Sequence, residues 1–391
     1  MALKKLNKVD DEGYNVERAW ELEAEALDGI RPLKSDHLVR LITAFKRGDE
    51  HYIVLEWAQG GNLKQFWEER GSPNQALNED EIRAYLVQLR GLSGALNQLH
   101  TDKLFRHMTG IASASNTSKG LLTATNGLSS ASQPQRGSHV RHGDLKPDNV
   151  LNFARSPKTL GILKIADLGL AKEHLDPTGR RTQATKANFG TTHYEPPQVI
   201  IASHVPRSRL YDIWSMGCII FESVIWMLYG REGLEMFWKQ KVVYKSKDSL
   251  YFTTNSTNTN ATLSNVVSSL ISFILDSERE KSKGSPSMVH DLLVLVRDGL
   301  LVVDLPRDNE DPRLGGGRRI RSDRLHSEMQ RIVKQAERST YLNSAKRGRL
   351  PIPQALQSSN LGLLKPATGN SALSTSGRQV SFLSELLKKL N

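Results

Sequence analysis

The sequence predicts an α+β protein in which strands and helices are largely separated along the chain. Short segments with the apolar pattern of β-strands lie mostly within the first 57 residues, around one amphipathic helical segment. From there to about residue 338, apolar residues recur mainly at helical spacing. The two patterns predict a small, incomplete antiparallel sheet with one helix, followed by a larger and mainly helical region.

The predicted sheet takes its strands from three short segments. Residues 1–6 read as a strand, and residues 16–28 carry apolar side chains at helical spacing with acidic residues between them. Residues 37–45 and 51–55 predict two more strands around the polar turn 46–49. One helix flanked by three strands is therefore expected in this part of the chain.

The helical region begins after Gly60-Gly61-Asn62, which breaks the strand pattern. Residues 79–100 give the longest amphipathic pattern, with leucines repeated along one face. Further helices are predicted over 211–229, 289–303 and 322–337.

Three stretches lack the apolar residues that a core needs. Residues 108–139 and 253–264 are dominated by Ser, Thr, Asn and other small or polar residues, and we expect both to be disordered insertions. From residue 339 the chain is polar and mostly disordered, apart from an amphipathic patch over 380–390 for which we favour self-docking or disorder. The predicted domain limits are 1–57, 58–338 and 339–391.

Positive charge is concentrated near the C-terminus. The 391 residues carry a formal net charge of +11, and from Arg313 onward there are 15 Lys and Arg against 4 Asp and Glu. Such a tail can contact acidic partners. It can also attract nucleic acid or anionic lipid, but a solvated tail with no dedicated partner is the favoured interpretation, so nucleic acid binding is not expected.

The cysteine content and the apolar segments indicate an intracellular protein, cytoplasmic or nuclear. The single cysteine, Cys218, excludes a disulfide within the chain. The N-terminus has no signal-peptide pattern. The most apolar stretch, 218–229, is interrupted by Glu222 and is too short to cross a bilayer, so no membrane span is expected.

The most informative segment for function is the octet His142-Gly143-Asp144-Leu145-Lys146-Pro147-Asp148-Asn149. It is followed by a strand pattern over 162–166 and then by Asp167-Leu168-Gly169. Two carboxylates and an amide on a loop and an adjacent strand end are what phosphoryl transfer needs, because one orients a hydroxyl and the others hold Mg²⁺. A polar turn with internal hydrogen bonds is the simpler reading, but both segments in this order make chance a poor explanation.

The octet resembles the catalytic loop of the eukaryotic protein kinases, and Asp167-Leu168-Gly169 is similar to their metal-binding triplet with Leu for Phe. Lys146 followed by Pro147 resembles the serine/threonine branch, and residues 221–230 resemble kinase domains of filamentous fungi. The resemblance implies a two-lobed protein-kinase-like fold that uses ATP and Mg²⁺ to phosphorylate a protein hydroxyl. It implies that Asp144 is the base, that Lys146 neutralises phosphoryl charge, and that Asn149 and Asp167 bind Mg²⁺.

The resemblance extends to the nucleotide-binding residues. Met1-Ala2-Leu3-Lys4 looks like the family's lysine strand, so Lys4 is implied to bind the nucleotide phosphates. Glu23 has the spacing of its acidic partner, with Glu21 and Glu25 as rivals. The implied hinge, ribose and adenine contacts are Ala2, Leu55, Glu56, Ala58, Asn62 and Leu151.

Three segments in the helical region also fit the family pattern. Residues 190–198 resemble the segment that follows the activation loop, and Asp212 is implied to be a buried anchor of the catalytic-loop backbone. Arg319 is implied to contact Gln198, where the family has Glu, so only a neutral hydrogen bond is expected. Gly143 replaces an Arg that binds activation-loop phosphate in many kinases, so activity is expected not to depend on that phosphate.

One departure keeps two other functions open. The family's Gly-rich loop precedes the lysine strand, but here the chain starts at that strand. We favour an N-terminally truncated kinase over a decayed one, because the downstream catalytic residues are intact. A pseudokinase acting as an interaction module is the alternative. The second alternative is a small-molecule kinase, because His-Gly-Asp also resembles the aminoglycoside and choline phosphotransferases.

Overall fold

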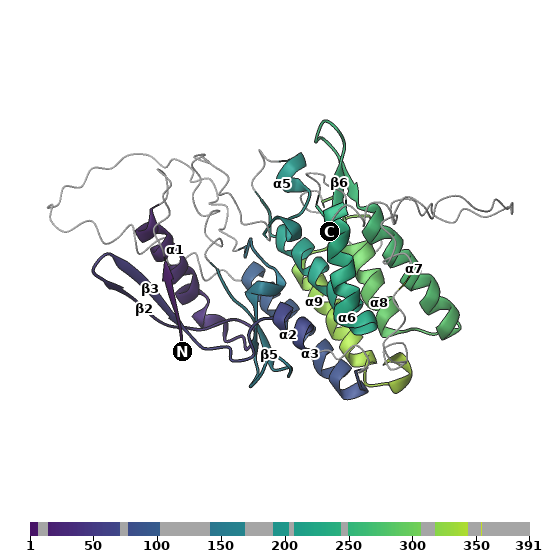
Figure 1. Ribbon diagram of the computed structural model, residues 1–391, viewed down its shortest axis with the longest axis horizontal. Helices are drawn as coiled ribbons and strands as arrows, with labels where there is room; N and C mark the ends of the chain where they lie inside the picture. The colour runs from purple at the N-terminus through teal and green to yellow at the C-terminus, as the bar shows by residue number, and fades with distance from the viewer. Residues whose placement is uncertain are drawn as a thin grey trace, which may run out of the picture.

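The protein, described from a computed structural model, consists of a small sheet lobe and a larger helical lobe (Figure 1). The residues that the structure describes are 1–6, 15–70, 77–101, 141–168, 191–202, 207–243, 249–305, 317–342 and Pro353. The predicted α+β, two-lobed architecture is confirmed.

The sheet lobe contains three antiparallel strands and one helix. Strands β1 (Ala2–Leu6), β2 (Leu41–Arg47) and β3 (Glu50–Leu55) pair in the order β1-β3-β2. Helix α1 (Val16–Gly29) begins at its N-cap Asn15, whose side chain accepts a hydrogen bond from the Arg18 N–H. The indole of Trp20 donates to the Tyr52 carbonyl at 2.9 Å and joins α1 to β3.

The helical lobe is built around its apolar helices. Its helices are α2 (Leu63–Glu69), α3 (Glu79–Thr101), α5 (Gln198–Ile201), α6 (Leu210–Val243), α7 (Asn265–Ser282), α8 (Met288–Leu295) and α9 (Ser322–Gln335). Two hairpins complete it, β4 (Val150–Phe153) with β5 (Ile162–Ile165), and β6 (Phe252–Thr254) with β7 (Ala261–Leu263). The predicted helices over 79–100 and 322–337 are confirmed.

Helix α6 is the centre of this lobe and extends well beyond the predicted 211–229. Its axis is broken at Gly230, where the backbone has φ 69° and ψ −162°, values that glycine adopts without steric cost. By length and composition the stretch Leu210–Gln240 could cross a membrane, but its most apolar window is wholly buried in the protein. The core of the helical lobe therefore accounts for this apolar helix.

Two predictions about order were wrong. Residues 253–264, expected to be disordered, form the β6–β7 hairpin. The tail was predicted to begin at residue 339, but Ser339–Leu342 form a 3-10 turn in which Tyr341 and Leu342 are buried. The predicted insertion at 108–139 and the patch at 380–390 lie outside the described residues.

A buried carboxylate joins three segments of the helical lobe. Glu222 on α6 accepts hydrogen bonds from the Tyr251 hydroxyl at 2.7 Å, the Trp238 indole at 3.0 Å and the Tyr194 hydroxyl at 2.9 Å. Burial raises the pKa of Glu222 from 4.5 to about 7, although the three donors act in the opposite direction.

The raised pKa gives Glu222→Gln a pH-dependent effect on stability. Below pH 4.5 the Glu222 carboxyl is protonated in both the folded and the unfolded chain. Between pH 4.5 and about 7 it ionises in the unfolded chain but remains protonated in the folded chain. The free energy of unfolding of the wild type therefore decreases as the pH rises through this range. From below pH 4.5 to above pH 7, Glu222→Gln is expected to gain about 3 kcal/mol in stability relative to wild type. Urea unfolding of both proteins at several pH values measures the difference, and parallel curves would contradict the prediction.

Candidate active site

The backbone of the predicted catalytic loop is held by one buried carboxylate. Asp212, at the start of α6, accepts hydrogen bonds from the backbone N–H groups of His142 and Gly143, both at 2.8 Å, and bonds to His100 Nε2 at 2.9 Å. Burial acts to raise the pKa of Asp212, but the His100 hydrogen bond and nearby positive groups outweigh it and lower the pKa. The predicted role of Asp212 as a backbone anchor agrees with this geometry.

The ring of His142 connects the catalytic loop to the strand that precedes Asp167. Its Nδ1 accepts from the Asp144 N–H at 3.2 Å, and its Nε2 lies 2.8 Å from the carbonyl oxygen of Ala166. A neutral ring with its proton on Nε2 satisfies both contacts. Because His142 is fully buried, the two segments are held in a fixed relation.

Asp144 lies in contact with both other polar residues of the loop. The Lys146 ammonium is 2.9 Å from Asp144 Oδ2, and the Asn149 amide donates to the same oxygen at 3.0 Å and to the Asp144 carbonyl at 2.8 Å. The Asp144 and Lys146 side chains are 15% and 16% exposed, which leaves each partly open to solvent. The structure therefore brings the three predicted residues into one cluster.

Lys4 joins the sheet lobe to the end of β5. Its ammonium lies 2.7 Å from Glu23 Oε1 and 3.0 Å from Asp167 Oδ1. Burial alone would lower the pKa of Lys4, but the charges of Asp167 and Glu23 raise it. Of the candidate partners, Glu23 is the buried one that reaches Lys4, whereas Glu21 contacts Arg18 at 3.3 Å.

Asp167 and Asn149 are neighbours through the β4–β5 hairpin. The Ala166 N–H donates to the Asn149 carbonyl at 2.9 Å, and Asp167 has a left-handed backbone with φ 64°. Among the described residues no group of three His, Cys, Asp or Glu side chains could hold a metal ion. A carboxylate and an amide oxygen are hard ligands of the kind that Mg²⁺ prefers beside nucleotide phosphates, so this pair fits the ion.

The predicted adenine and ribose contacts lie where the two lobes join. Ala2 pairs with Leu55 across β1 and β3, and Asn62 forms an isolated bridge with Leu151. The Asn62 side chain caps α2 by accepting from the Gln65 N–H at 2.9 Å. Ala58, in the same connecting segment, is 9% exposed.

Glu56, the remaining predicted hinge residue, has a contact that sequence reasoning missed. Its carboxylate binds the Lys164 ammonium at 2.7 and 2.8 Å and accepts from the Arg40 N–H at 2.9 Å. Neither the Glu56 carbonyl nor the Ala58 N–H has a hydrogen-bond partner among the described residues. The only sequence signal for the Lys164 contact is a lysine inside the apolar strand β5.

Arg141 was also missed. Its guanidinium is buried, lies 4.8 Å from the ring centre of Tyr211, and occupies the space beside Gly143. A Cβ on Gly143 would lie 3.1 Å from Arg141 Nη2, and the Gly143 backbone has φ +84°. A side chain at position 143 is therefore disfavoured both by contact and by backbone strain.

The predicted contact between Arg319 and Gln198 is present. Arg319 Nη2 donates to Gln198 Oε1 at 3.0 Å, and the same guanidinium donates to the carbonyls of Val302 and Leu210 at 2.9 and 3.0 Å. Burial lowers the pKa of Arg319 to about 9, so it stays charged at neutral pH. The segment that contains Gln198 is thereby fixed to the core.

Comparisons with known proteins agree with this geometry. The family model of the protein kinase domain matches residues 123–292. The chain is 26% identical over 225 residues to serine/threonine-protein kinase 33 of Bos taurus, 25% over 227 to serine/threonine-protein kinase ULK1 of Homo sapiens, and 30% over 164 to a probable cell division protein kinase of Encephalitozoon cuniculi. These alignments cover 56%, 57% and 40% of this chain, and 35%, 16% and 58% of those proteins.

The matched segment contains the catalytic-loop octet, Asp167 and the anchoring carboxylate of Asp212. The similar proteins are named as protein kinases, two of them as serine/threonine-protein kinases. The family model covers a protein kinase domain over less than half of the chain, and together with the similar proteins it supports a place in the eukaryotic protein kinase superfamily, of the serine/threonine type.

Proposed function

We propose that this protein transfers the γ-phosphate of ATP to a serine or threonine hydroxyl of a protein substrate. The observation that carries the proposal is the position of the Lys4 ammonium, within 3.0 Å of both Glu23 and Asp167. Lys4 and Asp167 are 163 residues apart in the sequence but form an ion pair in the structure. An ion pair with only a structural role would not need the cluster of Asp144, Lys146 and Asn149 as well.

Each residue has a distinct part in the proposed reaction. Lys4, oriented by Glu23, binds the nucleotide phosphates, and Asp144 orients the substrate hydroxyl and accepts its proton. Lys146 neutralises charge on the transferring group. A bound Mg²⁺ would supply charge neutralisation on the phosphates, and Asn149 and Asp167 are the residues that would hold it.

The adenine ring is proposed to lie against Ala2 and Leu151. The carbonyl of Glu56 and the N–H of Ala58 have no hydrogen-bond partner among the described residues, and this supports hydrogen bonds from both to the edge of the ring. Within a reducing intracellular compartment, the basic C-terminal tail is proposed to contact acidic partners.

Mg·ATP binding by two neighbouring lysine variants tests the proposal. We expect Mg·ATP to stabilise the wild-type protein, by about 2.7 kcal/mol at 100 times its dissociation constant. Lys4→Met is expected to lose this stabilisation. Lys5→Met, on the same strand but paired with the exposed Glu50, is expected to keep it.

Thermal unfolding with and without nucleotide measures the effect, and phosphate transfer to a protein is assayed alongside. No stabilisation of the wild-type protein would favour the pseudokinase alternative. Transfer to an aminoglycoside or choline but not to protein would favour the small-molecule kinase.

A further inference from the structure

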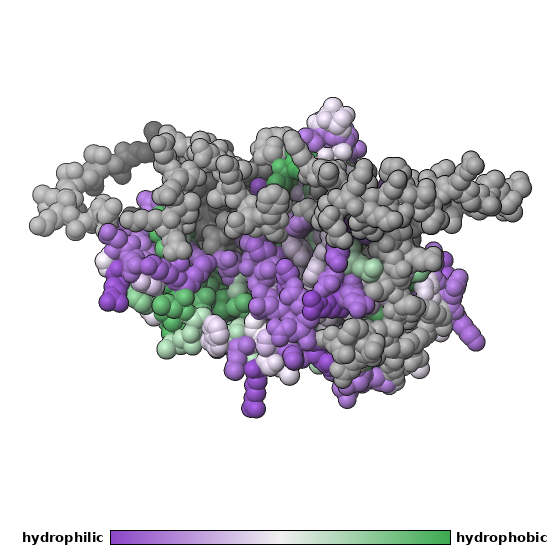
Figure 2. All heavy atoms as spheres, viewed as in Figure 1, coloured by the Kyte–Doolittle hydropathy of each residue, from purple (hydrophilic) through white to green (hydrophobic). Residues whose placement is uncertain are grey.

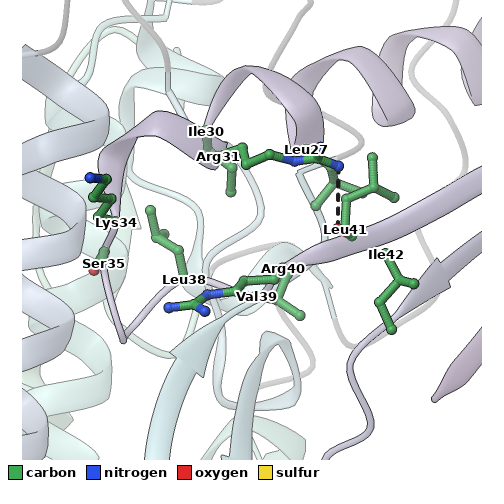
Figure 3. A pocket seen from close by; sticks show the side chains of 10 residues that line it. All are labelled: Leu27, Ile30, Arg31, Lys34, Ser35, Leu38, Val39, Arg40, Leu41 and Ile42. Atoms are coloured by element: carbon green, nitrogen blue, oxygen red, sulfur yellow. Dashed lines mark hydrogen bonds between the residues drawn. The ribbon is translucent and has the colours of Figure 1, made fainter.

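The sheet lobe contains a cavity that the proposed reaction does not use. It has a volume of about 600 Å³ and lies between the end of α1, the turn that follows it and the start of β2 (Figure 3). None of its lining residues belongs to the proposed nucleotide or catalytic residues. Its volume is within the range of ligand-binding sites, roughly 300–1,000 Å³.

The floor of the cavity is aliphatic. Leu27 and Ile30 come from α1, and Leu38 comes from the segment before β2; all three are buried. Ile42 at the start of β2 remains 45% exposed at the side of the cavity. Figure 2 shows hydrophobic surface gathered over the sheet lobe, at the lower left of the view. The cavity can therefore take an apolar side chain out of water.

Cationic side chains surround this apolar floor. Arg31, Lys34 and Arg40 line the cavity, and none of its described lining residues is acidic. Arg31 and Arg40 form exposed ion pairs with Asp28 at 3.4 Å and Asp36 at 3.5 Å, and Arg31 also donates to the Leu41 carbonyl at 3.5 Å. Lys34 has no ion pair among the described residues. The cavity is thus complementary to a ligand with negative charge beside an apolar group.

A sheet edge that no described strand covers borders the cavity. Strand β2 is at the end of the order β1-β3-β2, and within the described residues it pairs only with β3. A register irregularity between Leu41 and Thr43 sets Ile42 apart from the regular pairing. The outer edge of β2 can accept main-chain hydrogen bonds from an extended segment, whose alternate side chains would then point to one side.

We propose that this cavity binds an extended peptide segment of a partner protein, in which aliphatic or aromatic residues alternate with acidic ones. The apolar side chains fill the space over Leu27, Ile30 and Leu38, and the acidic ones meet the three cations. The chain's own residues 380–391 fit less well, because they contain one Glu and two Lys. The peptide's binding does not depend on the proposed phosphate transfer.

The test uses fluorescence anisotropy with the labelled peptide EELEFELEE as the probe. We expect micromolar binding that weakens about tenfold in the double variant Arg31→Gln/Lys34→Asn. Asn is chosen because Lys34 has φ 47°, a left-handed backbone that Asn tolerates. Arg47→Gln, an exposed arginine at the other end of β2, is the matched control and should bind like wild type.

Three further probes identify the occupant. The peptide KKLKFKLKK and an N-methylated form of the acidic peptide are expected to bind at least about tenfold more weakly, the first through charge and the second through lost edge pairing. A peptide of residues 380–391 is expected to bind more weakly than the acidic probe. Equal binding by the double variant and Arg47→Gln, or tighter binding of decanoate or of the 380–391 peptide, would overturn the proposal.

Discussion

Replacing Asp144 with Asn is expected to lower the rate of phosphate transfer by about 10²–10⁴-fold without unfolding the protein. The amide has the size of the carboxylate but cannot accept the proton of the substrate hydroxyl. Asp144 is 15% exposed and contacts Lys146 and Asn149, so its loss leaves no deeply buried charge without a partner.

Initial rates of phosphate transfer from labelled ATP to a protein substrate measure the effect. Asp49→Asn, in the exposed turn between β2 and β3, is the control and should keep the wild-type rate. Thermal unfolding of Asp144→Asn should remain close to that of wild type. Transfer at the wild-type rate by Asp144→Asn would rule out Asp144 as the base.

Asp212→Ala should have the largest effect on stability, a loss of about 3–5 kcal/mol. The substitution leaves the N–H groups of His142 and Gly143, and the ring of His100, without their buried acceptor. Because the whole free energy of unfolding of a domain is about 5–15 kcal/mol, this is a substantial part of it.

Urea unfolding gives the free energy directly, with the exposed helical residue Asp276→Ala as the control. An Asp212→Ala protein that is already unfolded at room temperature without urea, while the control is folded, would support the prediction equally. A free energy within about 1 kcal/mol of the control would show that Asp212 does not anchor the loop.

The part of the site that lies within one short segment could be predicted from the sequence. The octet at 142–149 supplies Asp144, Lys146 and Asn149 within eight residues, so their proximity follows from the loop itself. The choice of Glu23 over Glu21 and Glu25 could only be ranked by spacing. Choosing between them requires the rotation of α1 relative to β1, which the contact between Trp20 and β3 helps to set.

Other features depend on contacts that composition hides. The hairpin at 253–264 looked disordered because it has few apolar residues. Its turn is held instead by Asn255, whose side-chain oxygen accepts from the N–H groups of Thr259 and Asn260 at 2.8 and 3.0 Å. The contact between Glu56 and Lys164 joins residues 108 apart, and no local pattern reports such a pair.

The same Glu56 carboxylate has a consequence for nucleotide exchange. It holds the connecting segment, the chain before β2 and strand β5 together, and the Lys164 side chain beneath it is only 9% exposed. Ions in solution screen such a shielded pair far less than a surface one. In the proposed reaction, opening of the lobes to release spent nucleotide would therefore work against a tether whose strength changes little with the salt content of the surroundings.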